Sequence, residues 1–275
     1  MPSGLGLSSS FLTEQERELS DRFLARGYVI TEAEYPEGLD RIRAEAARLA
    51  AEHLGEAAPR DPGVWLDSLH DRIDVAGLNS MRLAVIEGLN RNDWLARTYY
   101  EQARRALDTL VGNEVSMQRR INLSIQLPGD ESSLLPVHAD VWSGDSPYEI
   151  VLWIPLVDCF STKSMFILER EKEEPVHARL AEFRTVGTAG LQREIGPQLT
   201  WLDVPYGHVL LFSQNLMHGN EINRETTTRW SMNCRFKSVF TPYADKKLGE
   251  FFVPVTLRAA SRLGLDYNMP QGFDD

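Results

Sequence analysis

The chain has 275 residues, of which 43% are hydrophobic and 25% are charged, and its formal net charge is −11 at pH 7. This composition is typical of a globular protein and excludes a disordered chain. It contains no apolar run long enough to cross a bilayer as a helix. The acidic balance argues against a nucleic-acid partner, because phosphate binding requires a concentrated positive surface.

The start of the chain and its cysteines indicate a cytoplasmic protein. Met1-Pro2-Ser3-Gly4-Leu5-Gly6 lacks the basic segment and the long apolar segment of a secretory signal. Cys159 and Cys234 are too far apart for a disulfide scaffold or a zinc cluster. Both lie in apolar runs, so we expect buried, reduced thiols.

The first third of the chain predicts helices. Thr13 and Glu16 have the spacing of a capping box, and Gly27 follows the last apolar position of the helix that they begin. A short strand is expected at 28–30. Further helices are expected from about 36 to 55, 79 to 90 and 93 to 111, where apolar residues recur at helical spacing.

The period of the apolar pattern then changes from 3.6 to 2, which predicts strands. They are expected at 121–127, 149–157, 164–168, 199–204, 208–212 and 226–240, with one helix at about 175–186. Short strands separated by turn residues favour a sandwich or a barrel. The length suits one large β domain or two modest domains. We expect a single domain over 1–275, with a helical layer at 1–112 and a β-rich core at 113–275.

The longest strand, 226–240, separates its side chains into two kinds. Arg229, Ser231, Asn233, Arg235 and Lys237 share one face, and Trp230, Met232, Cys234 and Phe236 share the other. The polar face is either exposed to water on an open sheet or directed into the ligand cavity of a small barrel. A metal site inside the β-rich half favours the second interpretation.

His138 and Asp140 are two residues apart, so on a strand their side chains point to the same face. If His218 comes from a strand packed opposite, the three residues form the 2-His-1-carboxylate triad that holds non-haem Fe(II) and leaves other positions open. His53, His70 and His177 lie in polar segments, and we interpret them as surface residues. His208 begins an apolar strand, which favours a structural role.

Arg229 adds a candidate anion receptor, because a guanidinium held inside a barrel can bind a carboxylate through two parallel hydrogen bonds. Ser231 follows it on the same face of the strand. Taken alone, an outward arginine on a polar face is the simpler interpretation. Its place after the three candidate ligands favours the receptor.

These residues resemble the signature of a known family. His138-x-Asp140, then His218, then Arg229-x-Ser231 is similar to the pattern of the Fe(II)/2-oxoglutarate-dependent dioxygenases, in their phytanoyl-CoA dioxygenase branch. A closer resemblance is to the oxygenases of sporadic carbohydrate-biosynthesis clusters, of the streptomycin-cluster type. The stretches that carry it are 142–149, 162–165, 215–220 and 229–240. It covers roughly residues 115–270.

The resemblance implies a mainly β protein with flanking α helices, a double-stranded β-helix (jelly-roll, cupin-like) core with insertions, and an N-terminal helical layer. His138, Asp140 and His218 would bind Fe(II), and Arg229 with Ser231 would hold the distal carboxylate of 2-oxoglutarate. O₂ would be the second cosubstrate, and an unactivated C–H bond would be oxidised. A carboxylate at Asp140 argues against halogenation, since the halogenating relatives have a small residue there.

Further site residues are expected on neighbouring segments. Asn122 and Gln126 share one face of the strand before the triad and are candidates for cosubstrate binding or for plain hydrogen bonding. Trp142 has the parity of Asp140 and is a candidate wall of the substrate pocket. Residues 162–165, Thr-Lys-Ser-Met, stand where many members of the wider branch have Asn-Gly, so that branch's minor contacts do not transfer.

The expected substrate is a small polar molecule, and the resemblance implies a sugar, an aminocyclitol or a nucleotide-linked sugar. Two alternatives keep the barrel. One is a cupin-like sugar isomerase or epimerase with a histidine as general base, and the other is a non-catalytic sugar-binding module. The first leaves Arg229 and Ser231 unexplained, and the intact set of three ligands argues against the second.

Overall fold

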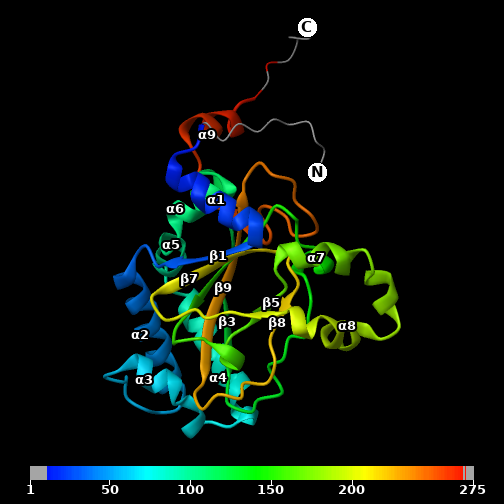
Figure 1. Ribbon diagram of the computed structural model, residues 1–275. Helices are drawn as coiled ribbons and strands as arrows, with labels where there is room; N and C mark the ends of the chain where they lie inside the picture. The colour runs from blue at the N-terminus through cyan, green and yellow to red at the C-terminus, as the bar shows by residue number, and fades with distance from the viewer. Residues whose placement is uncertain (1–10, 269, 271–275) are drawn as a thin grey trace.

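The computed structural model describes residues 11–268 and 270, so the six opening residues that argued against a secretory signal lie outside the described part. Figure 1 shows a β-rich body with helices from the N-terminal third along one flank and a helical arm on the opposite flank. The expected double-stranded β-helix with a helical layer is confirmed in this arrangement. No helix within the described ranges is both long enough and apolar enough to cross a membrane.

The N-terminal third folds into helices after one early strand. Their bounds are α1 (Glu14–Arg26), α2 (Pro36–His53), α3 (Pro62–Asp67), η2 (Leu69–Asp71), α4 (Val75–Asn90), α5 (Leu95–Glu101) and α6 (Arg104–Val111). The predicted capping box is present: the Thr13 hydroxyl accepts from the Glu16 N–H, and the Glu16 carboxylate accepts from the Thr13 N–H. Gly27 ends α1 in the left-handed conformation.

Two helix predictions need correction. The helix expected at 79–90 begins earlier, at Val75, because the Asp74 side chain accepts a hydrogen bond from the Gly77 N–H and caps it. The helix expected at 93–111 is broken into α5 and α6. The Glu34 carboxylate accepts from the backbone N–H of Arg105 at 3.0 Å, and this contact from a distant segment begins a separate helix.

The described strands form two antiparallel sheets. They are β1 (Tyr28–Glu32), β2 (Val115–Gln118), β3 (Asn122–Gln126), β4 (Ile150–Pro155), β5 (Phe166–Ile167), β6 (Thr200–Trp201), β7 (His208–Ser213), β8 (His218–Gly219), β9 (Arg229–Ser238) and β10 (Phe252–Pro254). The larger sheet has the order β1-β7-β4-β9-β2-β10, with β3 also on β9, and the smaller has the order β6-β5-β8. β2 and β10 were not predicted.

β9 is the central strand of the larger sheet. Its first half pairs with β3, from Gln126 opposite Arg229 to Asn122 opposite Asn233, and its second half pairs with β2. β4 pairs with it on the other edge. The face with Trp230 and Phe236 is fully buried in the main core, against the helical layer. The polar face is therefore directed away from that core, toward the smaller sheet.

The remaining helical elements lie in loops of the β-rich half. They are η3 (Asp140–Ser143), η4 (Ser161–Lys163), α7 (Arg170–His177), η5 (Leu180–Arg184), α8 (Gly187–Ile195), η6 (Gly196–Gln198) and α9 (Ala259–Leu265). The single helix expected at 175–186 is thus several short ones. They pack around Phe183 and Leu191 into a second core behind the smaller sheet, which also contains Met217. Cys159 and Cys234 are buried free thiols, as predicted.

Candidate metal centre and anion pocket

His138, Asp140 and His218 meet at one end of the space between the two sheets. Each offers a ligand atom, and these atoms all lie within 4.8 Å of one another. The two imidazole rings are 4.4 Å apart between centroids, and His138 Nε2 is 3.6 Å from Asp140 Oδ1. The described residues thus bring two nitrogens and one oxygen to a common point.

The backbone places the two histidines opposite each other. The N–H of His138 donates to the carbonyl of His218 at 3.0 Å, and the N–H of His218 donates back at 2.8 Å. Gly219 permits this pairing, because a Cβ there would lie 2.6 Å from the Leu135 carbonyl oxygen. The strand parity expected for Asp140 does not continue beyond Ala139, since Asp140 begins the 3₁₀ helix η3. Ala139 is still extended, and Asp140 reaches the same point.

Both imidazoles are held in the tautomer that a metal requires. His138 Nδ1 lies 2.8 Å from the Pro136 carbonyl oxygen, and His218 Nδ1 lies 2.9 Å from the Leu216 carbonyl oxygen. A carbonyl can only accept, so each neutral ring carries its proton on Nδ1. Nε2 of each ring then presents a lone pair, and the ring orientation is fixed by the same bond.

The electrostatics of the triad favour the ligating forms of two residues. Burial of His218 lowers its pKa to about 4, so the ring is neutral at pH 7. Burial alone would raise the pKa of Asp140, but the hydrogen bond with His138 and the charges around it outweigh burial and lower it to about 2. Burial would lower the pKa of His138, yet its contacts with Asp140 and the Pro136 carbonyl raise it.

Arg235 holds the outer oxygen of Asp140, a role that we did not predict. Its Nη2 is 3.3 Å from Asp140 Oδ2, and its Nε is 3.2 Å from Asp145 Oδ1. Asp145 also pairs with Lys246, and the Arg235 guanidinium donates to the side-chain oxygens of Gln118 and Gln214. Arg235 is therefore surrounded by acceptors from its own chain. The alternation of β9 placed it on the cavity face, but no local pattern identified its partners.

A cavity of about 280 Å³ adjoins the triad. Its polar side comes from β3 and β9, including Asn122, Ser124, Ser231 and Asn233, and the sequence had predicted this face. Its apolar side comes from β4 and β7. The apolar residues from these strands, which sequence reasoning did not assign to the site, are Val151, Trp153 and Phe212, and Leu135 and Met165 also line the cavity.

Arg229 lies in the wall of the same cavity and is 4% exposed. Its Nη1 donates to the Ser164 carbonyl at 3.0 Å, and its Nη2 donates to the Ser124 hydroxyl at 3.0 Å. Among the described side chains, no carboxylate forms an ion pair with it, and burial lowers its pKa. Within the same described part, Arg229 Nε and the hydroxyls of Ser231 and Ser164 have no hydrogen-bond partner. This wall therefore has spare donors around a buried positive charge.

The other expected site residues lie in three different places: on the cavity wall, buried outside it, and exposed at the surface. Asn122 lines the cavity, and its amide donates to the Asn233 side chain at 3.0 Å. Gln126 is fully buried beyond the end of the cavity, where its amide donates to the Glu221 carbonyl at 2.8 Å, which is a structural contact. Trp142 is 42% exposed on η3 and does not line the cavity, because the chain has left strand geometry before it.

The comparisons with known proteins bear on the fold. No protein-family profile matches the sequence, and no curated protein matches it significantly. Among solved structures, a non-heme monooxygenase, ThoJ, in a nickel complex is 16% identical, with a TM-score of 0.54 over 86% of this chain and 84% of that one. The epimerase SnoN, in complex with Fe³⁺, alpha ketoglutarate and nogalamycin RO, is 16% identical, with a TM-score of 0.51 over 83% and 86%. EctD from S. alaskensis in its apoform is 15% identical, with a TM-score of 0.51 over 82% and 78%. The chain shares the fold of these proteins.

Proposed function

We propose that the protein is a non-haem Fe(II) and 2-oxoglutarate-dependent oxygenase that oxidises a small polar molecule. The observation that carries this proposal is the presence of two sites in one cavity. Three convergent candidate metal ligands stand at one part of its wall, and a buried guanidinium with no partner anion among the described side chains stands at another. A metal and a carboxylate-bearing cosubstrate satisfy both.

The donor set fits iron. His138, Asp140 and His218 would hold one face of the ion, and three protein ligands leave coordination positions for small molecules. The hydrogen bond with His138 and the charges of His218 and Arg235 keep Asp140 ionised, and Arg235 contacts Oδ2 while Oδ1 lies near His138. When bound, iron with 2-oxoglutarate and O₂ supplies the oxidising power that converts 2-oxoglutarate to succinate and CO₂ and oxidises a substrate C–H bond.

Arg229 and Ser231 fit the distal carboxylate of 2-oxoglutarate. A buried, unpaired guanidinium is costly, and a bound carboxylate offsets that cost while satisfying the Ser231 hydroxyl. Hydrogen bonds to the Ser124 hydroxyl and the Ser164 carbonyl fix the plane of the Arg229 guanidinium. We assign Asn122, which faces the same cavity, to contact with the cosubstrate or substrate.

The substrate that we propose is a sugar, an aminocyclitol or a nucleotide-linked sugar. Three asparagines, Asn122, Asn220 and Asn233, line the cavity together with Arg235, and hydroxyl-rich molecules match such amide donors and acceptors. The neighbours ThoJ and SnoN are named as a monooxygenase and an epimerase, which supports oxidative chemistry on this fold without fixing the outcome. A metal-free isomerase or a sugar-binding module leaves the spare donors around Arg229 unexplained.

Titration calorimetry in the absence of O₂ tests the proposal. We expect Fe(II) to bind first and 2-oxoglutarate to bind only to the iron-loaded protein. Under air, the same protein should form succinate from 2-oxoglutarate. His138→Ala should abolish both metal binding and succinate formation, whereas His53→Ala, at an exposed helix end, should change neither. Succinate formation by His138→Ala at the wild-type rate would refute the assignment.

A further inference from the structure

The residues before and after Arg229, the arginine that we assign to the distal carboxylate, are both hydrogen-bonded to the end of α3. Trp230 is fully buried, and its Nε1 donates to the Leu66 carbonyl at 3.0 Å. The backbone N–H of Thr228 donates to the Asp67 carbonyl at 2.8 Å. Leu66 and Asp67 are the last two residues of α3, and we call them the α3 anchor. The anchor thus fixes the residue before Arg229 and the residue after it.

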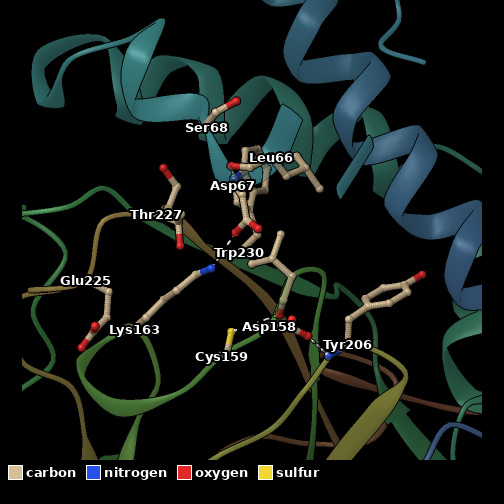
Figure 2. A network of polar contacts seen from close by, with 12 residues as sticks. Leu66, Asp67, Ser68, Asp158, Cys159, Lys163, Tyr206, Glu225, Thr227 and Trp230 are labelled. Atoms are coloured by element: carbon tan, nitrogen blue, oxygen red, sulfur yellow. Dashed lines mark hydrogen bonds and ion pairs between the residues drawn. The ribbon is translucent and has the colours of Figure 1, made fainter. Parts of the chain in front are cut away.

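The same anchor reaches the segment that touches the Arg229 guanidinium. Lys163 is 1% exposed, and its ammonium lies 2.5 Å from Asp67 Oδ1. Figure 2 shows its side chain extended toward Asp67, with Leu66 beside it in α3. The next residue, Ser164, supplies the carbonyl that accepts from Arg229 Nη1. Two consecutive residues of α3 therefore contact both the strand that carries Arg229 and the turn whose carbonyl accepts a hydrogen bond from the Arg229 guanidinium.

The turn before Ser164 has a strained backbone conformation. Ser161 has φ of 44°, the one non-glycine residue with positive φ in the described part of the chain. Such strain persists where surrounding contacts fix the backbone. The fixing contacts are the Lys163–Asp67 ion pair and the hydrogen bond from the Thr162 hydroxyl to Glu225 at 2.8 Å. Without the ion pair, the turn can relax, and the Ser164 carbonyl moves with it.

A buried ammonium is a poor choice for stability alone. Removing the Lys163 ammonium from water carries a desolvation penalty, and an apolar side chain of similar volume would fill the space without it. A short ion pair does, however, fix the distance between two segments that lie far apart in the chain. This geometry suits a role in positioning.

We infer that the α3 anchor and Lys163 are positioning residues for Arg229, so that the N-terminal helical layer sets the affinity for the distal carboxylate of the cosubstrate. This inference rests on the proposed function. None of the three residues lines the cavity. They act through the backbone of β9 and through the Ser164 carbonyl.

The test compares two ligands that differ only at the distal end. 2-Oxoglutarate and 2-oxopentanoate share the 2-oxo acid group, but the second has a methyl group in place of the distal carboxylate. Their Kd values are measured by calorimetry on protein loaded with Mn²⁺. The wild-type protein should prefer 2-oxoglutarate. The double variant Asp67→Asn with Lys163→Met removes both charges together, which avoids leaving one buried and unpaired.

We expect the double variant to lose about tenfold of this preference, because a displaced binding group loses affinity through poor alignment. Its Kd for 2-oxopentanoate should not change. Trp230→Phe, which removes the bond to the Leu66 carbonyl together with the pyrrole part of the buried ring, should shift the preference in the same direction. It also serves as the test if the double variant fails to fold. Glu56→Ala is the matched control, since it removes a bond to the side chain of Trp65, which precedes the anchor in α3, and should leave the preference intact.

Each outcome decides between the claims. A wild-type preference that persists unchanged in the double variant and in Trp230→Phe overturns the inference and leaves the proposed function standing. Equal weakening for both ligands also overturns it, because general loosening is then the cause. A wild-type protein with no preference for 2-oxoglutarate refutes the carboxylate site itself, and the inference falls with it.

Discussion

Arg229 and Arg235 stand on the same face of the same strand, and both line one cavity, yet their surroundings are opposite. Arg235 contacts Asp140 and Asp145 and donates to two glutamines. Arg229 is more deeply buried and contacts one hydroxyl and one carbonyl. The protein neutralises Arg235 itself, whereas the described side chains give Arg229 no carboxylate partner.

The difference shows how to recognise a binding arginine among structural ones. A buried guanidinium that already has two carboxylates gains little from a third, whereas one with neutral partners gains a charge-assisted pair when an anion arrives. This criterion supports our proposal that Arg229 binds the cosubstrate and that Arg235 supports Asp140 as a metal ligand. A variant of each arginine tests its assignment separately.

Arg229→Met should have the largest effect. We expect the Kd for 2-oxoglutarate to rise about 100-fold, since losing a buried charged partner costs about 3 kcal/mol. Metal binding should stay at the wild-type level, because Arg229 does not contact the triad. Calorimetry with Mn²⁺ and then with 2-oxoglutarate measures both constants. A loss of metal affinity in this variant would show that the two arginines do not divide their roles.

Arg235→Gln should reverse that pattern. Asp140 loses its cation, so its pKa rises from about 2, and metal affinity should fall by about 10–100-fold. The loss should be greater at pH 5 than at pH 8, because protons compete for the ligands. Lys246→Met removes only the outer partner of Asp145 and should cost less. Equal losses in the two variants would place the effect in Asp145 instead of Asp140.

The contrast between paired and unpaired buried charges extends to acids. Glu173 is 6% exposed, and burial raises its pKa to about 7, although its carboxylate accepts from the Met217 N–H at 2.6 Å. The folded state therefore keeps this proton at pH values where the unfolded state has lost it. The stability that Glu173 contributes is complete below pH 4.5 and is lost as the pH rises through 7.

Denaturant unfolding at several pH values measures this effect. We expect the free energy of unfolding of the wild-type protein to fall by about 1–2 kcal/mol between pH 5 and pH 8 from Glu173. Glu173→Gln keeps an acceptor for the Met217 N–H and cannot ionise, so its curve should be flatter over this range. A variant with the same slope as the wild type would show that the carboxyl is ionised throughout.

Trp142→Ala should have the smallest effect. The side chain is 42% exposed on η3 and lies outside the cavity wall. We expect metal and 2-oxoglutarate affinities within about twofold of the wild type, since surface substitutions of this kind rarely exceed about 0.5 kcal/mol. A larger loss of either affinity would indicate that Trp142 does contribute to the pocket wall, as its position in the sequence suggested.

Sequence reasoning predicted the parts of the site that depend on local periodicity. The alternation of β9 placed Arg229 and Ser231 on one face, and that face lines the cavity. It did not reveal the role of Arg235, because Asp140 and Asp145 come from a segment far away in the chain. The parity argument does not extend to Trp142, since a parity holds only while the backbone stays extended.

The helical layer shows the same limit. Its helices could be predicted from apolar spacing, but the break before Arg105 depends on Glu34, which reaches it from a loop some seventy residues earlier. The contact between Asp67 and Lys163 is equally non-local. A single sequence carries periodicity within each element, and it does not state which elements meet.

The lack of a side chain at Gly219 limits which substitutions protein engineering can use near the site. Any side chain there would collide with the Leu135 carbonyl and the Phe166 ring, and the paired segments that carry His138 and His218 would have to separate. Mutant libraries that aim to change the substrate range should therefore hold this codon constant. Diversity is better introduced on the apolar wall at Val151 and Trp153, which come from β4 and not from the paired segments that carry the histidines.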